Sequence, residues 1–217
     1  LSARLPKDEL AGYTIGGNAY NLIMPVTFGL STVGLTSVGN AMGENNHNKA
    51  KRYLKACLLL ACCFIIILEL VGLFSKRWIL GIFVSPDSPV FDYSLLVFNL
   101  YMLKFPCDCI SAPLNAGIKA TANEKKGVLV TLLSDYLVLV PVAWILVKVL
   151  DLGVTGLIGS TTIKILANII GFCVVFAFTN WKKQAGLVQK AIEESKQKKQ
   201  IENPRRLSVI EEAQLVL

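Results

Sequence analysis

The sequence LAGYTIGGNAYNLIMPVTFGLSTVGLTSVGNAMG, residues 10–43, contains no Lys, Arg, Asp or Glu. A helix needs about 20 mainly apolar residues to cross the roughly 30 Å hydrocarbon core of a bilayer. The many glycines and Pro25 would weaken a helix in water. In lipid the backbone must hydrogen-bond internally, and small residues allow helices to pack closely. The stretch therefore predicts a membrane-spanning helix, and the pairs Gly12/Gly16 and Thr32/Thr36 predict that it is buried among other helices.

The composition of the whole chain supports a membrane protein. Of its 217 residues, 53% are hydrophobic and 17% are charged, and the mean hydropathy is +0.55. Soluble domains are about 45–50% apolar and about 25% charged. These figures exclude an ordinary soluble domain, a disordered chain and a small disulfide-stapled secreted module. The chain is therefore expected to be an integral membrane protein.

Five apolar segments can be counted, and they divide the chain into a membrane part, residues 1–180, and a basic tail, residues 181–217. The segments are expected to form helices over residues 11–42, 53–74, 93–118, 127–147 and 152–178. The tail is rich in Lys, Glu and Gln, and its residues 187–202 are predicted to form a helix that is exposed or lies on the surface. The predicted fold class is all-α.

The basic residues indicate how the chain is oriented in the membrane. The net charge is +7, and eight of the 22 basic residues lie in the tail: Lys182, Lys183, Lys190, Lys196, Lys198, Lys199, Arg205 and Arg206. Most of the others flank apolar segments, a pattern typical of membrane topology and lipid headgroups and not of a nucleic-acid groove. Because cytosolic loops are enriched in Lys and Arg, the C-terminus is predicted to be cytosolic, with membrane lipids as partners and no nucleic acid.

The cysteines and the single histidine do not form a metal motif. All six cysteines fall in apolar stretches, where a free thiol behaves as a small hydrophobic group. Cys107 and Cys109 flank Asp108, but this spacing is not a zinc signature, and His47 lies far away in a polar loop. Neither a disulfide framework nor a metal site is expected.

Four charged residues fall in the middle of apolar segments: Lys104, Asp108, Asp135 and Lys164. An Asp at a helix centre costs about 2.5–3.5 kcal/mol on insertion scales, so such residues usually face the interior of a bundle or a watery cavity. Lys104 and Asp108 stand four apart and are expected to form an ion pair on one helical face. Glu69 is expected to lie one turn from the end of its segment and to reach the interface.

Asp108 is the first candidate for a functional carboxylate. Pro106 and Pro113 lie beside it, and the backbone carbonyls that prolines leave free commonly line transporter cavities. Burial favours a neutral carboxyl group and a nearby cation favours the charged form, so the two forms can be brought close in energy. A substrate cation can then compete with a proton for the site. For Asp135 a functional and a structural role stay open, and Lys164 is expected to be a structural partner.

Three stretches together resemble the C-terminal half of the multidrug and toxic compound extrusion (MATE) family. They are FGLSTVGLTSVGNAMGENNHNKAK at residues 28–51, the stretch 115–141 with GIKATANEKKG at 117–127, and the stretch from LGVTGL at 152–157 to NWKK at 180–183. The resemblance covers about residues 8–190. It implies helices 8 to 12 of a twelve-helix, two-lobe transporter, which is an incomplete C-terminal lobe. The N-lobe and helix 7, with its acidic residue, would precede Leu1.

The resemblance implies export of organic cations, xenobiotics or secondary metabolites by alternating access, driven by inward H⁺ or Na⁺ and with no other cofactor. The acidic position of the family's helix 10 falls on Asp108, eleven residues before Lys119. Asn18 stands near a position that is Glu in some animal members, and Asp135 stands where an aromatic residue is common. The implied location is the plasma membrane or a vacuolar or endosomal membrane. A lone C-lobe is not expected to transport.

Three alternatives remain at this stage. One is a lipid-linked oligosaccharide flippase of the same superfamily, which would usually show a more basic cavity. Another is a non-transporting membrane scaffold or a truncated product. An intramembrane enzyme is disfavoured, because His-Glu-x-x-His and Gly-x-Gly-Asp do not occur in the sequence. In the tail, Arg205-Arg-Leu-Ser208 matches a short kinase motif that is common in basic tails.

Overall fold

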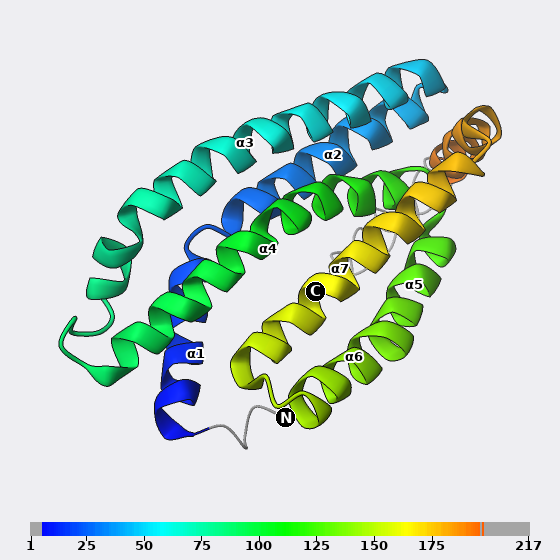
Figure 1. Ribbon diagram of the computed structural model, residues 1–217. Helices are drawn as coiled ribbons and strands as arrows, with labels where there is room; N and C mark the ends of the chain where they lie inside the picture. Colours follow the sequence, from blue (N-terminus) through cyan, green and yellow to red (C-terminus); the bar gives the residue numbers. More distant parts are fainter. Residues whose placement is uncertain (1–5, 196, 198–217) are drawn as a thin grey trace, which may run out of the picture.

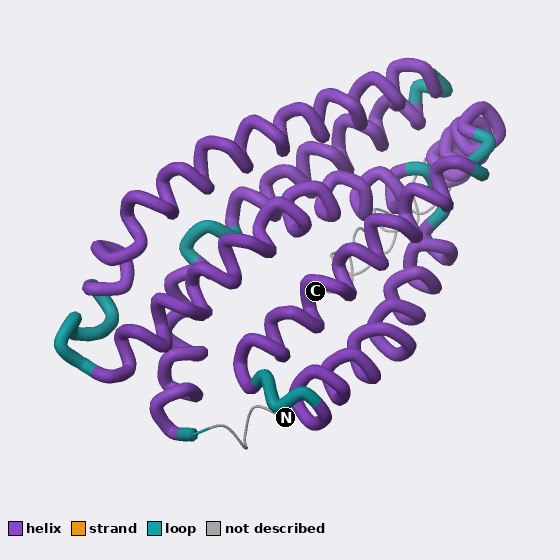
Figure 2. The backbone as a smooth tube through the Cα atoms, in the orientation of Figure 1, coloured by secondary structure: helices purple, strands orange, loops and turns teal. Residues whose placement is uncertain are grey.

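The charge-free stretch forms two helices and not one. The computed structural model describes residues 6–195 and 197, and in it α1 (Lys7–Asn21) and α2 (Pro25–Gly43) meet at an angle of 45°. Proline fits the first turn of a helix, where its missing N–H is not needed, so Pro25 starts α2. At the break, the Thr27 hydroxyl donates a hydrogen bond to the Met24 carbonyl at 2.8 Å. The expected single helix over residues 11–42 is thus a bent pair (Figures 1 and 2).

The rest of the described chain forms four long helical spans and a shorter helix. The spans are α3 (His47–Gly81), α4 (Pro89–Ala120), a continuous run of α5 (Glu124–Leu133), η2 (Ser134–Leu139), α6 (Val140–Trp144) and η3 (Ile145–Val149), and α7 (Gly153–Ala177). All four are long and apolar enough to cross a membrane, and the number is five if the bent pair α1–α2 is counted as one span. The predicted all-helical fold with about five spans is confirmed.

Helix α4 occupies the centre of the bundle and contacts α1, α2, α3, α5 and α7. Helix α1 lies close to it because Gly12 and Gly16 carry no side chain. A Cβ atom added at Gly16 would lie 2.7 Å from Cγ1 of Val97 on α4. The small-residue pair Gly12/Gly16 is therefore a packing surface, whereas Thr32 and Thr36 are exposed and bond to their own helix.

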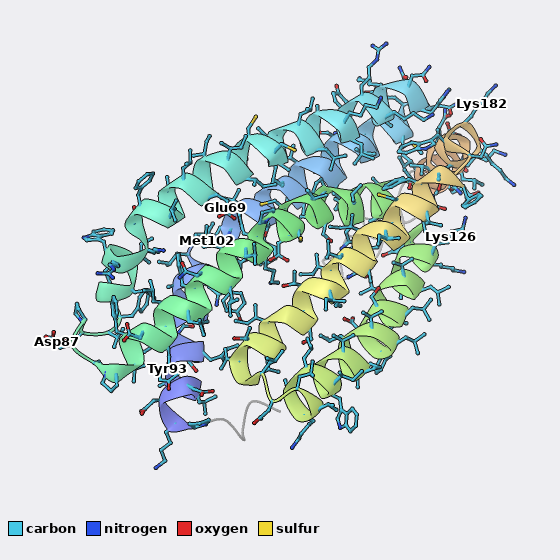
Figure 3. The ribbon with its side chains drawn as sticks, viewed as in Figure 1. Glu69, Asp87, Tyr93, Met102, Lys126 and Lys182 are labelled. Carbon is cyan, nitrogen blue, oxygen red and sulfur yellow. The ribbon has the colours of Figure 1, made fainter. Side chains whose placement is uncertain are left out.

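Helix α3 continues well beyond the expected residue 74, because Lys76 and Arg77 do not end it. Lys76 Nζ instead donates to Asn99 Oδ1 of α4 at 3.2 Å. Glu69 lies twelve residues before the end of the helix at Gly81, or about 18 Å at 1.5 Å per residue. The expectation that Glu69 lies one turn from the end of its segment is wrong. Its Oε1 is buried and has no hydrogen-bond partner among the described residues, and Figure 3 shows Glu69 midway along α3.

The span over residues 124–149 contains two turns of π-helix. Pro141 has no N–H, so it cannot donate to the carbonyl four residues earlier. The wider turn of η2 brings donors one residue later, and the Val140 N–H bonds to the Asp135 carbonyl. π-helical turns inside α-helices are frequent at functional sites.

The basic connections gather at one end of the bundle. Figure 3 shows Lys126 and Lys182 at this end, and Asp87 and Tyr93 at the other. A helix over residues 181–195, orange in Figure 1, docks here through Trp181, Ala185 and Val188. It begins earlier than the predicted 187–202, and Trp181 stacks on Phe176 with ring centroids 5.4 Å apart. Several residues singled out in the tail lie outside the described residues: Lys196, Lys198, Lys199, Arg205, Arg206 and Ser208.

The close approach of α1 and α4 predicts that Gly16→Ala destabilises the chain. A Cβ atom at Gly16 would also lie 2.8 Å from the Ser94 carbonyl oxygen, which is backbone and cannot move aside. Overpacking of this kind costs about 1–3 kcal/mol. We expect a lower thermal midpoint for the purified chain in detergent micelles.

Gly29→Ala is the matched control, because no atom lies within 4 Å of a Cβ atom built at Gly29. Alanine is the better helix former by about 1 kcal/mol, so this variant should be as stable as the unmodified chain or more stable. Equal midpoints for the two variants would contradict close packing at Gly16.

Candidate functional site

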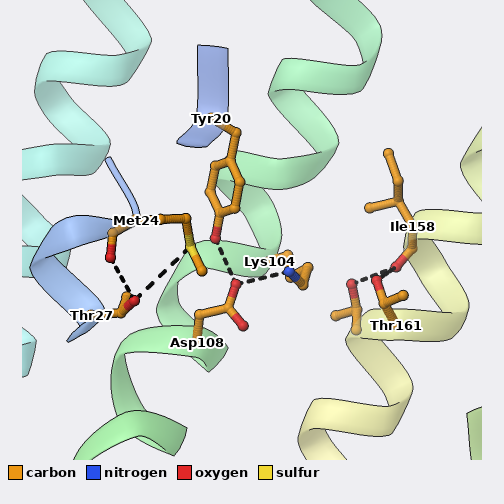
Figure 4. A network of polar contacts seen from close by, with 8 residues as sticks. Tyr20, Met24, Thr27, Lys104, Asp108, Ile158 and Thr161 are labelled. Atoms are coloured by element: carbon orange, nitrogen blue, oxygen red, sulfur yellow. Dashed lines mark hydrogen bonds and ion pairs between the residues drawn. The ribbon is translucent and has the colours of Figure 1, made fainter. Parts of the chain in front are cut away.

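The candidate site is centred on the carboxylate of Asp108 in the middle of α4. Its Oδ2 accepts a hydrogen bond from the Tyr20 hydroxyl of α1 at 2.6 Å and forms an ion pair with Lys104 Nζ at 2.9 Å (Figure 4). The expected pairing of Lys104 with Asp108 is present, one helical turn apart. Both recorded contacts use Oδ2, and Figure 4 shows the second carboxylate oxygen pointing away from both partners.

The Lys104 ammonium group lies beside a pair of stacked tyrosine rings. The rings of Tyr20 and Tyr101 are stacked, with centroids 4.8 Å apart and an angle of 11° between them. Lys104 Nζ lies 5.4 Å from the centroid of each ring, within the range of a cation–π interaction. The Lys104 and Asp108 side chains are 11% and 13% exposed, so the pair is largely withdrawn from solvent. Each charge is compensated by groups of the protein itself.

The bends in the helices position these groups. Tyr20 is the last but one residue of α1, immediately before the break that precedes Pro25. The close packing of α1 on α4 brings its hydroxyl to Asp108. Pro106 lies inside α4 between Lys104 and Asp108, and Figure 1 shows α4 bending along its length. A proline in a helix interior removes one backbone hydrogen bond and bends the helix.

Asp108 opens onto a cavity of about 430 Å³ between α4, the span over residues 124–149, and α7. The polar side chains of α4 that line it follow helical spacing. Those of α7 face them from the opposite wall. The polar lining consists of Lys104, Asp108, Ser111 and Asn115 from α4, Thr131 from α5, and Thr161, Lys164 and Asn168 from α7. A volume of this size falls within the range of small-molecule sites.

A second ion pair lies on the far side of the cavity. Lys164 Nζ is 2.9 Å from Asp135 Oδ1 at the start of η2, and the two side chains are 24% and 36% exposed. Lys164 lines the cavity, whereas Asp135 is not among the lining residues. One turn along α7, Asn168 is buried, and its Oδ1 has no hydrogen-bond partner in the described part of the chain.

The structure brings some of the predicted site residues together and not others. Lys104 and Asp108 share one site, and Asp135 lies across the cavity in its own pair. Asn18 is exposed on α1 and does not line the cavity. Their roles in binding stay predictions.

Sequence reasoning missed Tyr20 and Asn168. Asn168 stands four residues after Lys164 in an apolar run, so the polar spacing on α7 could have revealed it. Tyr20 pairs with a residue 88 positions away, and nothing local to it signals this contact.

The described residues hold no group of three or more His, Cys, Asp or Glu side chains suited to a metal ion. Cys107 and Cys109, which flank Asp108, are both free thiols.

A family model described as MatE matches residues 1–145, which is more than half of the chain. The chain belongs to the MatE family. The resemblance expected from the sequence is thus confirmed, and the chain is a multi-pass membrane protein. The site around Asp108 lies within the matched region.

Named relatives span animals, plants and bacteria. The chain is 28% identical to multidrug and toxin extrusion protein 1 of Rattus norvegicus over 191 residues, which cover 84% of this chain and 32% of the relative. It is 27% identical to protein DETOXIFICATION 16 of Arabidopsis thaliana over 197 residues, covering 90% of this chain and 40% of the relative. The probable multidrug resistance protein NorM of Thermotoga maritima is 24% identical over 195 residues, covering 86% and 40%.

A solved structure of the eukaryotic MATE transporter AtDTX14 shares the fold, with a TM-score of 0.79 at 22% sequence identity. The match covers 88% of this chain and 43% of that transporter. The chain therefore has the fold of part of a MATE transporter. It spans about a third to two fifths of the length of the relatives it matches.

The burial of the Lys104–Asp108 pair predicts that Lys104→Met is strongly destabilising. It leaves the Asp108 carboxylate without its cation in a site that is largely withdrawn from solvent. Removal of one partner of a buried pair costs about 3–5 kcal/mol. The measurement is the unfolding free energy of the chain in mixed micelles.

The matched control is Lys49→Met. Lys49 pairs with Glu44 at 2.7 Å, but the two side chains are 39% and 56% exposed. Exposed pairs contribute about 0–1 kcal/mol, so this variant should lose little stability. Adding Asp108→Asn to Lys104→Met should recover part of the loss. Equal losses for the two single variants would show that the Lys104–Asp108 pair is not the stabilising contact inferred above.

Proposed function

We propose that this chain forms the C-terminal part of a cation-coupled efflux transporter. Such a transporter exchanges H⁺ or Na⁺ for organic cations, xenobiotics or secondary metabolites. The observation that carries the proposal is the carboxylate of Asp108 in the middle of the long apolar helix α4. One of its oxygens is held by Tyr20 and Lys104, and the residue lines a cavity large enough for a small molecule. The names of the relatives, which refer to multidrug and toxin extrusion, support export.

Competition between the coupling ion and the substrate for the Asp108 carboxylate explains how the two can be exchanged. The carboxylate can be neutralised by Lys104, by a proton, by Na⁺ or by the cationic group of a substrate. Two cations close to one carboxylate repel each other, so binding of one weakens binding of the other. A coupling ion that enters from one side therefore favours release of the substrate, and a substrate that binds from the other side favours release of the ion. Mutual exclusion of this kind is the requirement for antiport.

The contacts of Asp108 offer a route from binding to conformational change. The Tyr20 hydroxyl joins the carboxylate to the end of α1, one residue before the break that leads into α2. A bound proton removes the charge that attracts both Tyr20 and Lys104. The bent pair α1–α2 is then free to settle at a different angle against α4. A ligand shifts such an equilibrium by its difference in affinity for the two states.

The orientation in the membrane follows from the basic connections, which gather at the end of the bundle where the helix over residues 181–195 docks. We place this end, and the C-terminus, in the cytosol, in a plasma membrane or a vacuolar or endosomal membrane, with membrane lipids as partners. The chain spans about a third to two fifths of these relatives, and we expect transport to require the helices that the resemblance assigns to the N-lobe and helix 7.

The proposal predicts that Asp108→Asn abolishes efflux driven by an ion gradient. Asparagine keeps the shape of the side chain but cannot bind a proton or balance a cation. The complete reading frame is expressed in cells that lack drug exporters. Efflux of a fluorescent organic cation is then measured with and without a pH or Na⁺ gradient, and protein levels are compared by immunoblot.

Asp92→Asn is the matched control on the same helix. Asp92 is exposed in the first turn of α4 and is not among the residues that line the cavity. We expect its efflux to equal that of the unmodified protein. Full gradient-driven efflux by Asp108→Asn at equal expression would refute the role assigned to Asp108. A wild-type protein with no gradient-driven efflux would refute the proposed function.

A further inference from the structure

The α7 wall of the cavity carries a donor and an acceptor that the exchange at Asp108 does not use. Lys164 and Asn168 both line the cavity and stand four residues apart, so they lie on one face of the helix. They face the α4 wall, where Asp108 lies. The two groups are of opposite hydrogen-bonding type, since an ammonium group only donates and an amide oxygen only accepts.

Asn168 is the more unusual of the two. It is only 6% exposed, and its Oδ1 is fully buried with no hydrogen-bond donor among the described residues. A buried acceptor without a partner costs about 1–3 kcal/mol. Most buried polar groups are hydrogen-bonded, and an exception calls for a physical reason, such as a ligand that supplies the missing donor. The Asn168 side chain lines the cavity, and a rotation of its amide group would bring Oδ1 within reach of such a donor.

Lys164 has hydrogen-bonding capacity to spare. Its ammonium group carries three protons, and its contact within the described chain is with Asp135 Oδ1 at 2.9 Å. Asp135 is not among the residues that line the cavity, and it neutralises the charge of Lys164. The other N–H groups of the ammonium remain available for hydrogen bonds. An acceptor in the cavity can therefore bind Lys164 without breaking its ion pair.

We propose that Lys164 and Asn168 recognise a hydroxyl group on the transported molecule. A hydroxyl oxygen accepts a hydrogen bond from Lys164 Nζ while its proton is donated to Asn168 Oδ1. This single group satisfies both side chains, whereas a carboxylate could satisfy only Lys164 and an ammonium group only Asn168. The inference rests on the proposed function and narrows its substrate class to organic cations that carry an alcohol or a phenol.

The α4 and α7 walls of the cavity then bind the two ends of one substrate molecule. The cationic group binds the Asp108 carboxylate on α4 in place of Lys104, and the hydroxyl group binds Lys164 and Asn168 on α7. The cavity of about 430 Å³ between them accommodates an aromatic or aliphatic spacer. A site built to bond a substrate hydroxyl rejects the analogue that lacks it, because the polar groups of the site are then left unpaired.

The test uses two cations that differ only in one hydroxyl group, tyramine and phenethylamine. Each competes with the efflux of a fluorescent organic cation from cells that express the complete reading frame. We expect tyramine to reach half-inhibition at a concentration about tenfold lower, which corresponds to about 1.4 kcal/mol for one hydrogen-bonded group. In Asn168→Leu, the half-inhibitory concentration of tyramine should rise to within about twofold of that of phenethylamine. The half-inhibitory concentration of phenethylamine should change little.

Asn115→Leu is the matched control, because Asn115 lines the same cavity from α4 and is not part of the proposed hydroxyl site. Its effect on the two competitors should be equal, so the tenfold preference should persist. Equal competition by the two amines in the wild-type protein, or an equal loss for both in Asn168→Leu, would overturn the inference. The second result would mean that a water molecule or packing alone accounts for Asn168. Lack of any gradient-driven efflux of the fluorescent cation in the wild type would instead overturn the proposed function.

Discussion

A charged carboxylate in the middle of a membrane-spanning helix has to be compensated by the protein, and the arrangement of this bundle follows from that constraint. Lys104 provides the countercharge to Asp108 from the same helix, and Tyr20 provides a hydrogen bond from α1. The hydroxyl reaches Asp108 only because α1 lies very close to α4. Gly16 permits this approach by leaving its face of α1 bare. The close packing at Gly12 and Gly16 thus helps to position the hydroxyl group that stabilises the Asp108 carboxylate.

The bends in the helices occur beside the polar groups. The break before Pro25 begins two residues after Tyr20, Pro106 lies between Lys104 and Asp108, and the π-helical turn that accommodates Pro141 contains Asp135 of the Asp135–Lys164 pair. Straight helices pack efficiently along their apolar faces, and a change of direction is useful where a polar side chain must reach a partner on another helix. In lipid such breaks are tolerated where neighbouring helices cover the freed backbone groups.

Local relationships could be predicted from the sequence, and distant ones could not. The number of spans follows from apolar length, and the Lys104–Asp108 pair follows from a spacing of four. The Tyr20 contact and the Asp135–Lys164 pair depend on how separate helices pack, which a single sequence does not specify. The α1–α2 break does not follow from the sequence, because Pro25 can either bend a membrane helix or begin a new one. The position of Glu69 differs from the expected one because Lys76 and Arg77, which are typical of the end of a span, lie inside α3, and this helix continues to Gly81.

The pairing of each cavity lysine with an aspartate has a consequence for selectivity. With both pairs closed, Lys104 with Asp108 and Lys164 with Asp135, the fixed charges around the cavity largely cancel. An entering cation then meets a weak net field and gains little from charge alone until it displaces Lys104 from Asp108. The cost of separating Lys104 from Asp108 is the same whichever monovalent cation enters. The neutral groups of the lining can therefore contribute to discrimination among substrates, and the buried Asn168 amide is one of them whose hydrogen-bonding capacity remains unfilled.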